Sequence, residues 1–243
     1  MGLKKAEGNM YSWCTHTHTH LGGVCPHRCV YCYVDNPRFG RPPRYQGELR
    51  LVEWEFKVKY DKQTLTLNRG VYPGVIFIEH MNDLFADDVP RGFIHRVLQH
   101  CQDFPDNTYV FQTKNPARYV TIGDITSTNY LTWPKYYMMG TTIETNRPMS
   151  TISRAPPTNE RAAAMALLKG RKFLTIEPIL QFDLDELLYM IVPIKPEFIN
   201  IGADSKKKGL LEPTWDEVRA LILGLTNAGI IVREKHNLER LKR

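Results

Sequence analysis

Short β-rich segments alternate with helical segments along most of the chain, and two of the strand segments are apolar almost without interruption. These are residues 74–78 and 198–201. They lack the alternation of polar and apolar side chains that a strand with one face in water shows. Strands buried on both faces belong to parallel sheets that carry helices outside them. The segments expected to form strands are residues 11–17, 74–80, 108–114, 136–142, 172–177, 198–202 and 229–233.

Helical patterns fill the intervals between these strands, at residues 90–102, 159–168, 184–194 and 215–227. Asn159 is the expected cap of the second helix. Thr214 and Glu217 form a capping-box pattern for the last, and Gly229 is expected to end it. The sequence therefore predicts an α/β fold, a partial (open) parallel β/α barrel of about six strands. Residues 1–243 are expected to form a single domain, with an inserted β-hairpin at residues 48–68.

The composition is that of an ordinary soluble globular protein, with 42% hydrophobic and 24% charged residues among 243. No apolar run approaches the ~18 residues that a membrane helix needs, and no apolar stretch follows Lys4 and Lys5 as in a signal peptide. A cytoplasmic protein without membrane attachment is expected. The net charge of +6 arises partly from basic stretches at residues 36–50 and 205–243, which suit a phosphate-rich partner or form a solvated surface.

Polar side chains follow five of the predicted strands. They lie at residues 79–83, 112–115, 141–144, Glu177 and residues 203–205. The carboxyl ends of parallel strands meet at one end of a barrel, where chemistry collects. Five polar strand ends in succession therefore predict a shared site.

Three cysteines, Cys25, Cys29 and Cys32, lie within eight residues, whereas Cys14 and Cys101 are isolated. Three thiolates can hold three irons of a [4Fe–4S] cluster and leave the fourth iron open for a cofactor or substrate. The alternative is a structural zinc site, which normally takes four ligands. His27 is the candidate fourth ligand, but it lies inside the first gap between the cysteines, where the geometry is awkward.

The cysteine segment resembles the cluster loop of the radical S-adenosylmethionine superfamily, because of its spacing, Tyr31 before the third cysteine and its place after the first strand of a β/α barrel. The segment also resembles the cluster loop of spore photoproduct lyase-like proteins, which has a tyrosine on each side of the third cysteine, as Tyr31 and Tyr33 lie here on either side of Cys32. A set of small phage and prokaryotic radical proteins of unsettled function has counterparts of four further segments. These are residues 82–85, 113–116, 142–146 and 176–178.

This resemblance implies a [4Fe–4S] cluster on Cys25, Cys29 and Cys32, with S-adenosyl-L-methionine on its open iron. Reductive cleavage of that cofactor then yields the 5′-deoxyadenosyl radical, which abstracts hydrogen from the substrate. The remaining roles follow by position. The cofactor contacts implied are Tyr31 for adenine, Asn82 for the methionyl amino group, Lys114 for the methionyl carboxylate, and Thr142 or Glu144 for the ribose.

Tyr33, His80 and Glu177 are the candidate catalytic residues. His80 marks a departure, because the lyase has a hydrogen-donating cysteine at the matching position and imidazole is a poor hydrogen-atom donor. Repair by the same relay is therefore in question. Glu177, with Glu144 and Asp204, is expected either to orient the substrate and its neighbours or to pair with arginines at the barrel mouth.

His16, His18 and His20 alternate with threonines. In a strand they would share one face with Cys14, as a second metal site or at the rim of the cluster pocket. Residues 38–45 interleave arginines with aromatic residues and prolines. Arg38, Arg41 and Arg44 are candidates for phosphate contacts, with Phe39 and Tyr45 stacking on exposed bases; a Pro-rich connecting loop is the alternative.

The sequence thus predicts a radical S-adenosylmethionine enzyme, a lyase or modifying enzyme whose substrate is a nucleic acid, in lesion repair or base modification. One alternative is the same chemistry on a peptide or small metabolite. Another is a non-catalytic metal-binding module that recognises nucleic acid. The enzyme would need an external electron donor of flavodoxin or ferredoxin type, and the sequence sets no oligomeric state.

Overall fold

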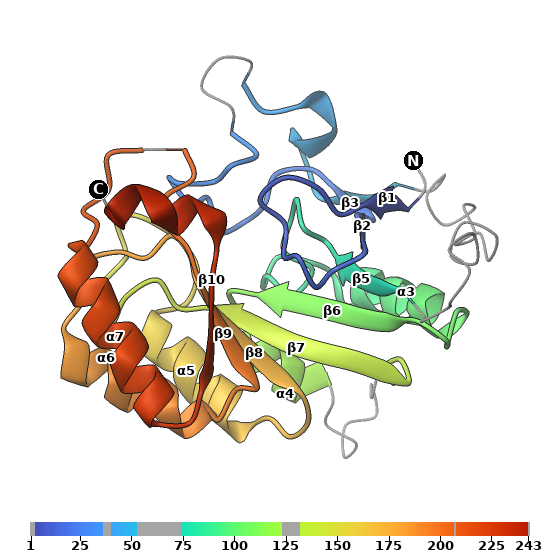
Figure 1. The fold of residues 1–243 in the computed structure, drawn as a ribbon. Helices are drawn as coiled ribbons and strands as arrows, with labels where there is room; N and C mark the ends of the chain where they lie inside the picture. The colour runs from blue at the N-terminus through green and yellow to red at the C-terminus, as the bar shows by residue number, and fades with distance from the viewer. Residues whose placement is uncertain (1–2, 36–39, 53–73, 123–131, 207, 243) are drawn as a thin grey trace.

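One sheet, parallel except at one edge, organises the protein, and its strands follow one another in space almost as they do in the chain (Figure 1). The computed structural model describes residues 3–35, 40–52, 74–122, 132–206 and 208–242. Seven strands pair in parallel, and β1 runs antiparallel to β2 at one edge. In spatial order the strands are β1 (Lys4–Lys5), β2 (His16–His18), β5 (Val75–Ile78), β6 (Thr108–Thr113), β7 (Tyr136–Thr142), β8 (Lys172–Ile176), β9 (Phe198–Ile201) and β10 (Ile231–Glu234).

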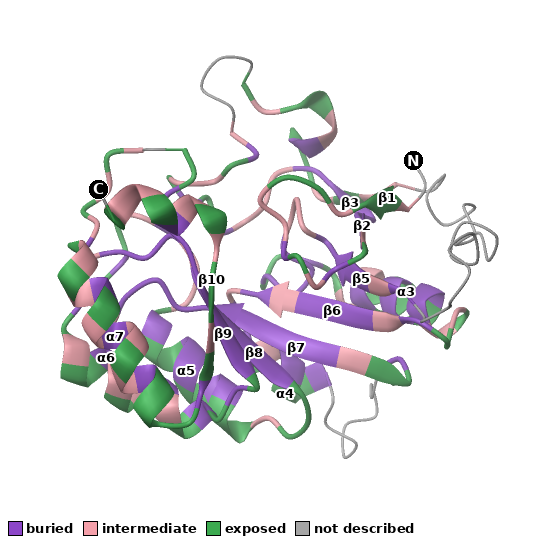
Figure 2. Cartoon of the chain, viewed as in Figure 1, coloured by how far each residue is buried: buried purple, intermediate pink, exposed green. Residues whose placement is uncertain are grey.

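The two edge strands, β1 and β10, each pair with one neighbour and not with each other, so the sheet is an open barrel. Every residue of β8 and β9 is buried, as the uninterrupted apolar pattern of residues 198–201 predicts (Figure 2). The α/β fold and the partial parallel barrel expected from the sequence are confirmed. The observed sheet has eight strands rather than about six: seven of them overlap the expected segments, and β1 adds one more at an edge.

Helices on the outside of the sheet connect successive strands. They are α3 (Arg91–Gln102), α4 (Ala117–Ile122), α5 (Thr158–Leu167), α6 (Leu184–Ile191) and α7 (Trp215–Asn227), with the 3-10 turns η1 (Pro43–Tyr45), η2 (Val192–Ile194) and η3 (His236–Lys242). The capping box of Thr214 and Glu217 is confirmed, and Gly229 follows α7 with φ +78°. Helix α5 instead begins at Thr158 without the Asn159 cap. Helix α4 was not predicted, since six residues carry too little periodicity.

The N-terminal segment is not the long strand that its alternating pattern predicts. Only residues 16 and 17 of the expected 11–17 join the sheet, in a strand that ends at His18. Tyr11 and Trp13 instead stack on each other with ring centroids 5.1 Å apart, and Trp13 packs edge-on against Phe173 and Phe198. Tyr11 and Trp13 thus pack into the aromatic cluster inside the barrel, where aromatic side chains contribute large buried areas.

The expected hairpin at residues 48–68 lies mostly outside the described residues. What is described pairs differently: β4 (Arg50–Leu51) is antiparallel to β3 (Leu21–Gly22), just before the cysteine loop. At Gly23, with φ +88°, a Cβ would lie 2.1 Å from the carbonyl oxygen of Glu48. Only glycine permits that approach, so this crossing sets where the cysteine loop begins.

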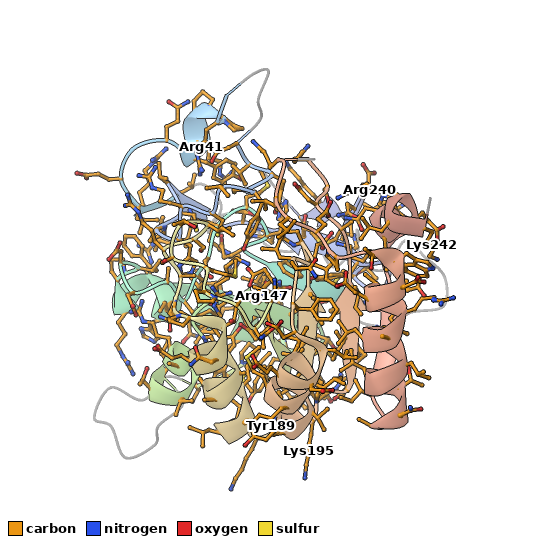
Figure 3. All side chains as sticks on the ribbon, turned by 90° about the vertical axis from the view of Figure 1, so that its left-hand side faces the viewer. Arg41, Arg147, Tyr189, Lys195, Arg240 and Lys242 are labelled. Atoms are coloured by element: carbon orange, nitrogen blue, oxygen red, sulfur yellow. The ribbon has the colours of Figure 1, made fainter. Side chains whose placement is uncertain are left out.

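The carboxyl ends of the parallel strands face the same end of the molecule as the loop that carries the cysteines. Arg41, just beyond that loop, lies at this end, whereas Tyr189 and Lys195 lie at the opposite end (Figure 3). Within the described ranges, no helix is long and apolar enough to cross a lipid bilayer.

Candidate functional site

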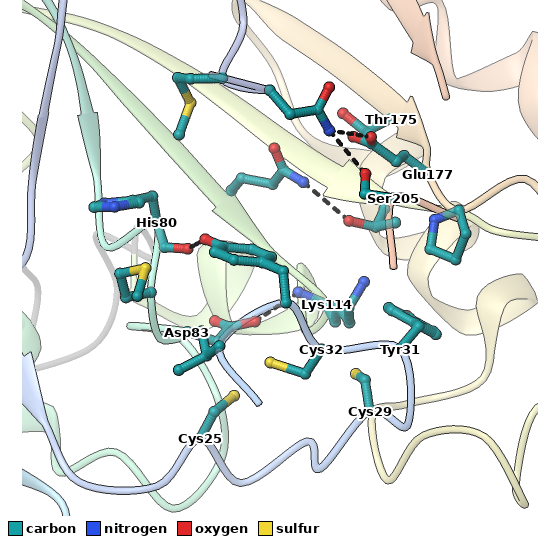
Figure 4. Close-up of a pocket in the computed structure, with 18 of the residues that line it drawn as sticks. Cys25, Cys29, Tyr31, Cys32, His80, Asp83, Lys114, Thr175, Glu177 and Ser205 are labelled. Atoms are coloured by element: carbon teal, nitrogen blue, oxygen red, sulfur yellow. Dashed lines mark hydrogen bonds between the residues drawn. The ribbon is translucent and has the colours of Figure 1, made fainter. Parts of the chain in front are cut away.

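A cavity of about 520 Å³ opens at the carboxyl ends of the strands, beneath the cysteine loop (Figure 4). Residues at or just beyond the ends of β5 to β10 line it, so the predicted gathering of polar strand ends is observed. Among the candidate site residues, those lining the cavity are Cys25, Cys29, Tyr31, Cys32, Tyr33, His80, Asn82, Lys114, Thr142 and Glu177. Of the residues expected to hold the cluster, contact the cofactor or act in catalysis, Glu144 alone does not line it.

The loop from Cys25 to Cys32 is held in place by its backbone. The Val30 N–H donates to the carbonyl of Ile152 (2.9 Å), and the Arg154 N–H donates to the carbonyl of His27 (2.7 Å). All five cysteines of the chain are free thiols, and the three loop sulfurs lie around one side of the cavity (Figure 4). The loop therefore presents three thiols to one enclosed space.

This donor set fits a [4Fe–4S] cluster. Burial, and next the charge of Asp83, raise the pKa of the Cys25 thiol to about 12, and the positive charge of bound iron would offset both. No group of three His, Cys, Asp or Glu side chains within the described residues is arranged around a single ion. Three thiolates that bind three different irons need not converge on one point.

Asp83 connects the cysteine loop to the strand ends, a role that was not predicted from the sequence. Its carboxylate accepts from His27 Nε2 (2.8 Å), from the Thr113 hydroxyl (2.7 Å) and from the Lys114 N–H (2.8 Å). Burial alone would raise the pKa of Asp83, but the contacts with His27, Thr113 and Lys114 hold it below its ordinary value. His27, the alternative zinc ligand, is thus engaged by a carboxylate. The only sequence signal was the polar run after β5.

Glu144 lies behind the cavity wall and positions two residues that line the cavity. Its Oε1 accepts from Lys114 Nζ (2.8 Å) and from the Tyr31 hydroxyl, and its Oε2 accepts from Arg161 Nη1 (2.9 Å). The side chains of Glu144 and Arg161 are 0% and 1% exposed. Burial would raise the pKa of Glu144, but the charges of Lys114 and Arg161 lower it to about 2. Because Lys114 and Arg161 together carry two positive charges and Glu144 carries one negative charge, the group has a net positive charge beside the cavity.

Replacing Arg161 with Met is expected to lower the free energy of unfolding by about 3–5 kcal/mol, because a buried carboxylate loses one of its two cations. Denaturant unfolding measures this. The matched control is Arg147→Met, since Arg147 pairs with Asp183 at the surface, and its stability is expected to change little. Equal losses in the two variants would contradict the assignment of Glu144 as a buried anchor.

Thr142 is the better placed of the two residues expected at the ribose. It lines the cavity, and its Oγ1 accepts from Gln112 Nε2 (2.9 Å), which leaves its own hydrogen for a ligand oxygen. Asn82 lines the cavity but also supports the loop, since its Nδ2 donates to the carbonyl of Gly23 (3.1 Å). The cofactor contacts expected of Thr142 and Asn82 stay predictions.

Glu177 forms an ion pair with a lysine rather than with an arginine, which was one of its two expected roles. Its Oε2 accepts from Lys235 Nζ (2.6 Å), and its Oε1 accepts from the side-chain amides of Asn9 and Asn237 (both 2.8 Å). Asp204 does not pair with an arginine through its carboxylate, which instead accepts from backbone N–H groups of its own loop, including that of Lys206. Glu177 thus joins segments from both ends of the chain at the cavity.

Tyr33 and His80 are in contact at the end of β5. The Tyr33 hydroxyl donates to the carbonyl of His80, and His80 Nδ1 lies 3.1 Å from Thr19 Oγ1. Burial, and next the charge of Lys4, lower the pKa of His80 to about 4, so this imidazole is neutral at pH 7. The catalytic roles expected of Tyr33, His80 and Glu177 stay predictions.

The alternating histidines neither line the cavity nor share a face with Cys14, which precedes the strand. His20 Nδ1 lies 3.0 Å from Glu79 Oε1, and its Nε2 lies 2.9 Å from Nδ1 of His100 on α3. The expected position of His16, His18 and His20 at the rim of the cluster pocket is wrong. The run turns inward after β2 and packs toward α3.

The arginine–aromatic segment is only partly described, since Arg38 and Phe39 lie outside the described residues. Tyr45 is buried, so the expectation that it stacks on an exposed base is wrong. Arg41 pairs with Asp35 (2.5 Å), and Arg44 donates to the carbonyl of Thr19 (2.6 Å). Part of this segment is therefore built into the fold as a connecting loop.

The protein is an open parallel β/α barrel with a three-cysteine loop over its mouth. It has the fold of spore photoproduct lyase. The resemblance to the radical S-adenosylmethionine superfamily predicts this fold. One mutant of that lyase superposes with a TM-score of 0.58 at 13% identity, over 93% of this chain and 65% of the lyase. A double mutant with bound AdoMet and dinucleoside spore photoproduct gives 0.55 at 12% identity, with the same coverage. The chain thus spans about 65% of the length of these structures.

The chain belongs to the family described as "Protein of unknown function (DUF5131)", whose model matches residues 9–216. That match includes the cysteine loop and all the strand ends that line the cavity except the one after β10. No curated protein matches the chain.

Proposed function

We propose that this protein is a radical S-adenosylmethionine enzyme. The observation that carries the proposal is the loop that presents Cys25, Cys29 and Cys32 to a cavity lined by polar strand ends. When bound, the [4Fe–4S] cluster and S-adenosyl-L-methionine would together supply the 5′-deoxyadenosyl radical that abstracts hydrogen from the substrate. The three cysteines would hold the cluster.

The cavity also suits an amino-acid cofactor with a ribose. Lys114 presents its ammonium group beside Tyr31, 5.3 Å from the ring centroid, and the buried Glu144 holds both residues. The excess positive charge left by Lys114 and Arg161 would bind the methionyl carboxylate. Thr142 would donate to a ribose oxygen, and Tyr31 would contact the adenine.

Formation of 5′-deoxyadenosine tests the enzymatic proposal. The anaerobically reconstituted protein, reduced with dithionite, is expected to convert S-adenosylmethionine to 5′-deoxyadenosine and methionine, measured by liquid chromatography with mass detection. A sample lacking dithionite is the control. A reduced, iron-loaded protein that forms no 5′-deoxyadenosine would contradict the proposal.

For the substrate we propose a nucleic acid, in lesion repair or base modification. The support is the net charge of +6, the exposed Lys206 in the cavity lining, and a fold shared with a lyase whose structures include a dinucleoside complex. A base inside a duplex would have to be flipped out to reach the cavity.

A single-stranded DNA oligonucleotide is the probe for this substrate class. We expect it to bind at low salt, with an affinity that falls steeply as salt rises, because phosphate contacts release counterions. Fluorescence anisotropy over a salt series measures this. Absence of binding at low salt would instead favour a peptide or a small metabolite, and the radical chemistry would stand.

A further inference from the structure

The outer side of the cysteine loop carries two arginines that form no ion pair. Arg28 and Arg154 are both exposed, and neither side chain has an ion pair or hydrogen bond with any residue the structure describes. Other arginines behave differently: Arg147 pairs with Asp183, and Arg171 pairs with Glu197. Two unpaired guanidinium groups at one place are available to a partner.

These two arginines flank an exposed apolar side chain. The segments around them lie side by side, because the Arg154 N–H donates to the carbonyl of His27 and the Val30 N–H donates to that of Ile152. Val30 is 47% exposed, whereas Cys29 beside it is 8% exposed. Arg28, Val30 and Arg154 together are called the cluster-loop face below.

The cluster-loop face lies next to Cys29, one of the three proposed cluster ligands. Cys29 Sγ lies 3.1 Å from the hydroxyl of Ser153, which directly precedes Arg154. A protein bound at this face would come close to Cys29 without entering the cavity, which the cofactor and substrate would fill. The face therefore offers a separate route for an electron.

The charge of the cluster-loop face selects an acidic partner. Residues 20–34 and 147–157, the segments that carry these three residues, contain no Asp or Glu. A small apolar centre with cationic neighbours suits the brief, small contacts of electron-transfer proteins, whose association is steered by opposite charge.

We propose that the cluster-loop face docks an acidic one-electron donor protein of flavodoxin or ferredoxin type. The inference rests on the proposed function, since it presumes a cluster on Cys25, Cys29 and Cys32. In the step it serves, the reduced flavin or iron–sulfur centre of the donor is oxidised by one electron and the cluster is reduced by one. No atom or proton has to cross the interface.

The double variant Arg28→Glu/Arg154→Glu tests the docking face. Lys169→Glu/Lys195→Glu is the matched control. Both lysines are exposed; Lys195 lies at the opposite end of the barrel (Figure 3), and Lys169 lies just before β8, at the amino end of that strand. Lys195, like Arg28, has a positive φ (53° and 46°). A reduced flavodoxin and a reduced plant-type ferredoxin serve as probes in anaerobic calorimetry. At low salt we expect the first variant to bind at least one probe about tenfold more weakly than wild type, and the control to bind like wild type.

The route of reduction separates this inference from the proposed function. With dithionite, which needs no docking face, the wild type and both variants are expected to form 5′-deoxyadenosine equally, while donor-driven formation falls only in the first variant. If dithionite drives no cleavage in the wild type, the proposed function fails. If dithionite works but neither probe binds the wild type, or both bind the two variants equally, the docking face is wrong.

Arg28 lies within the cysteine loop, so the double variant could lose its cluster. In that case a second variant tests whether the cluster-loop face binds the donor. Arg154→Gln lies outside the cysteine loop, and we expect it to weaken probe binding about threefold at unchanged iron content. Unchanged binding in that variant would overturn the proposal.

Discussion

Replacing any one of Cys25, Cys29 and Cys32 with Ala is expected to abolish the iron–sulfur absorbance of the anaerobically reconstituted protein. Each thiolate would hold a different iron, so the loss of one leaves two irons of the cluster without protein ligands. Iron and sulfide content should fall from about four of each per chain to nearly none. Absorbance and metal analysis measure this directly.

The other two cysteines supply the control. Cys14 packs with the aromatic residues inside the barrel, and Cys101 is buried on α3, away from the cavity. Cys14→Ala and Cys101→Ala are expected to keep the full cluster content. Full retention in Cys29→Ala would refute the three-cysteine assignment, whereas loss in Cys14→Ala would show that the ligand set is larger.

Lys114→Met is expected to weaken the binding of S-adenosylmethionine at least tenfold while leaving the cluster intact. The ammonium group of Lys114 would make a charge-assisted hydrogen bond to the methionyl carboxylate, a contact worth about 1.5–3 kcal/mol. Its side chain is 16% exposed, so little of that energy is lost to solvent screening. Equilibrium dialysis with labelled cofactor gives the dissociation constant.

Lys206→Met is the matched control for Lys114→Met. Lys206 also lines the cavity, on the loop after β9, but it is exposed and has no contact with Glu144 or Tyr31. Its replacement is expected to leave cofactor affinity within twofold of wild type. An equal loss in both variants would mean that general positive charge, rather than the position of Lys114, determines binding.

The fold and the cavity could be predicted because they depend on local patterns. Uninterrupted apolar runs such as residues 198–201 mark strands buried on both faces, and the polar residues that follow must gather at one end of a parallel barrel. The N-terminal segment was misjudged for a related reason. Alternating aromatic residues at Tyr11 and Trp13 fit a strand and an interior aromatic cluster equally well.

The contacts that position the site could not be predicted, because they join residues far apart in sequence. His27 and Asp83 are 56 residues apart, and Asn9 and Glu177 are 168 apart. Nothing in the sequence around Glu144 predicts that its side chain lies behind the cavity wall. Its place follows from Arg161, which α5 carries beneath the end of β7.

The central claim is that this cavity holds a cluster with an iron open to S-adenosylmethionine, and electron paramagnetic resonance of the reduced protein tests it most directly. We expect the signal of a reduced [4Fe–4S] cluster, and a clear change in its g values when S-adenosylmethionine is added, since the cofactor would bind the open iron. A spectrum that is identical with and without the cofactor, or a colourless protein that contains stoichiometric zinc, would contradict the account.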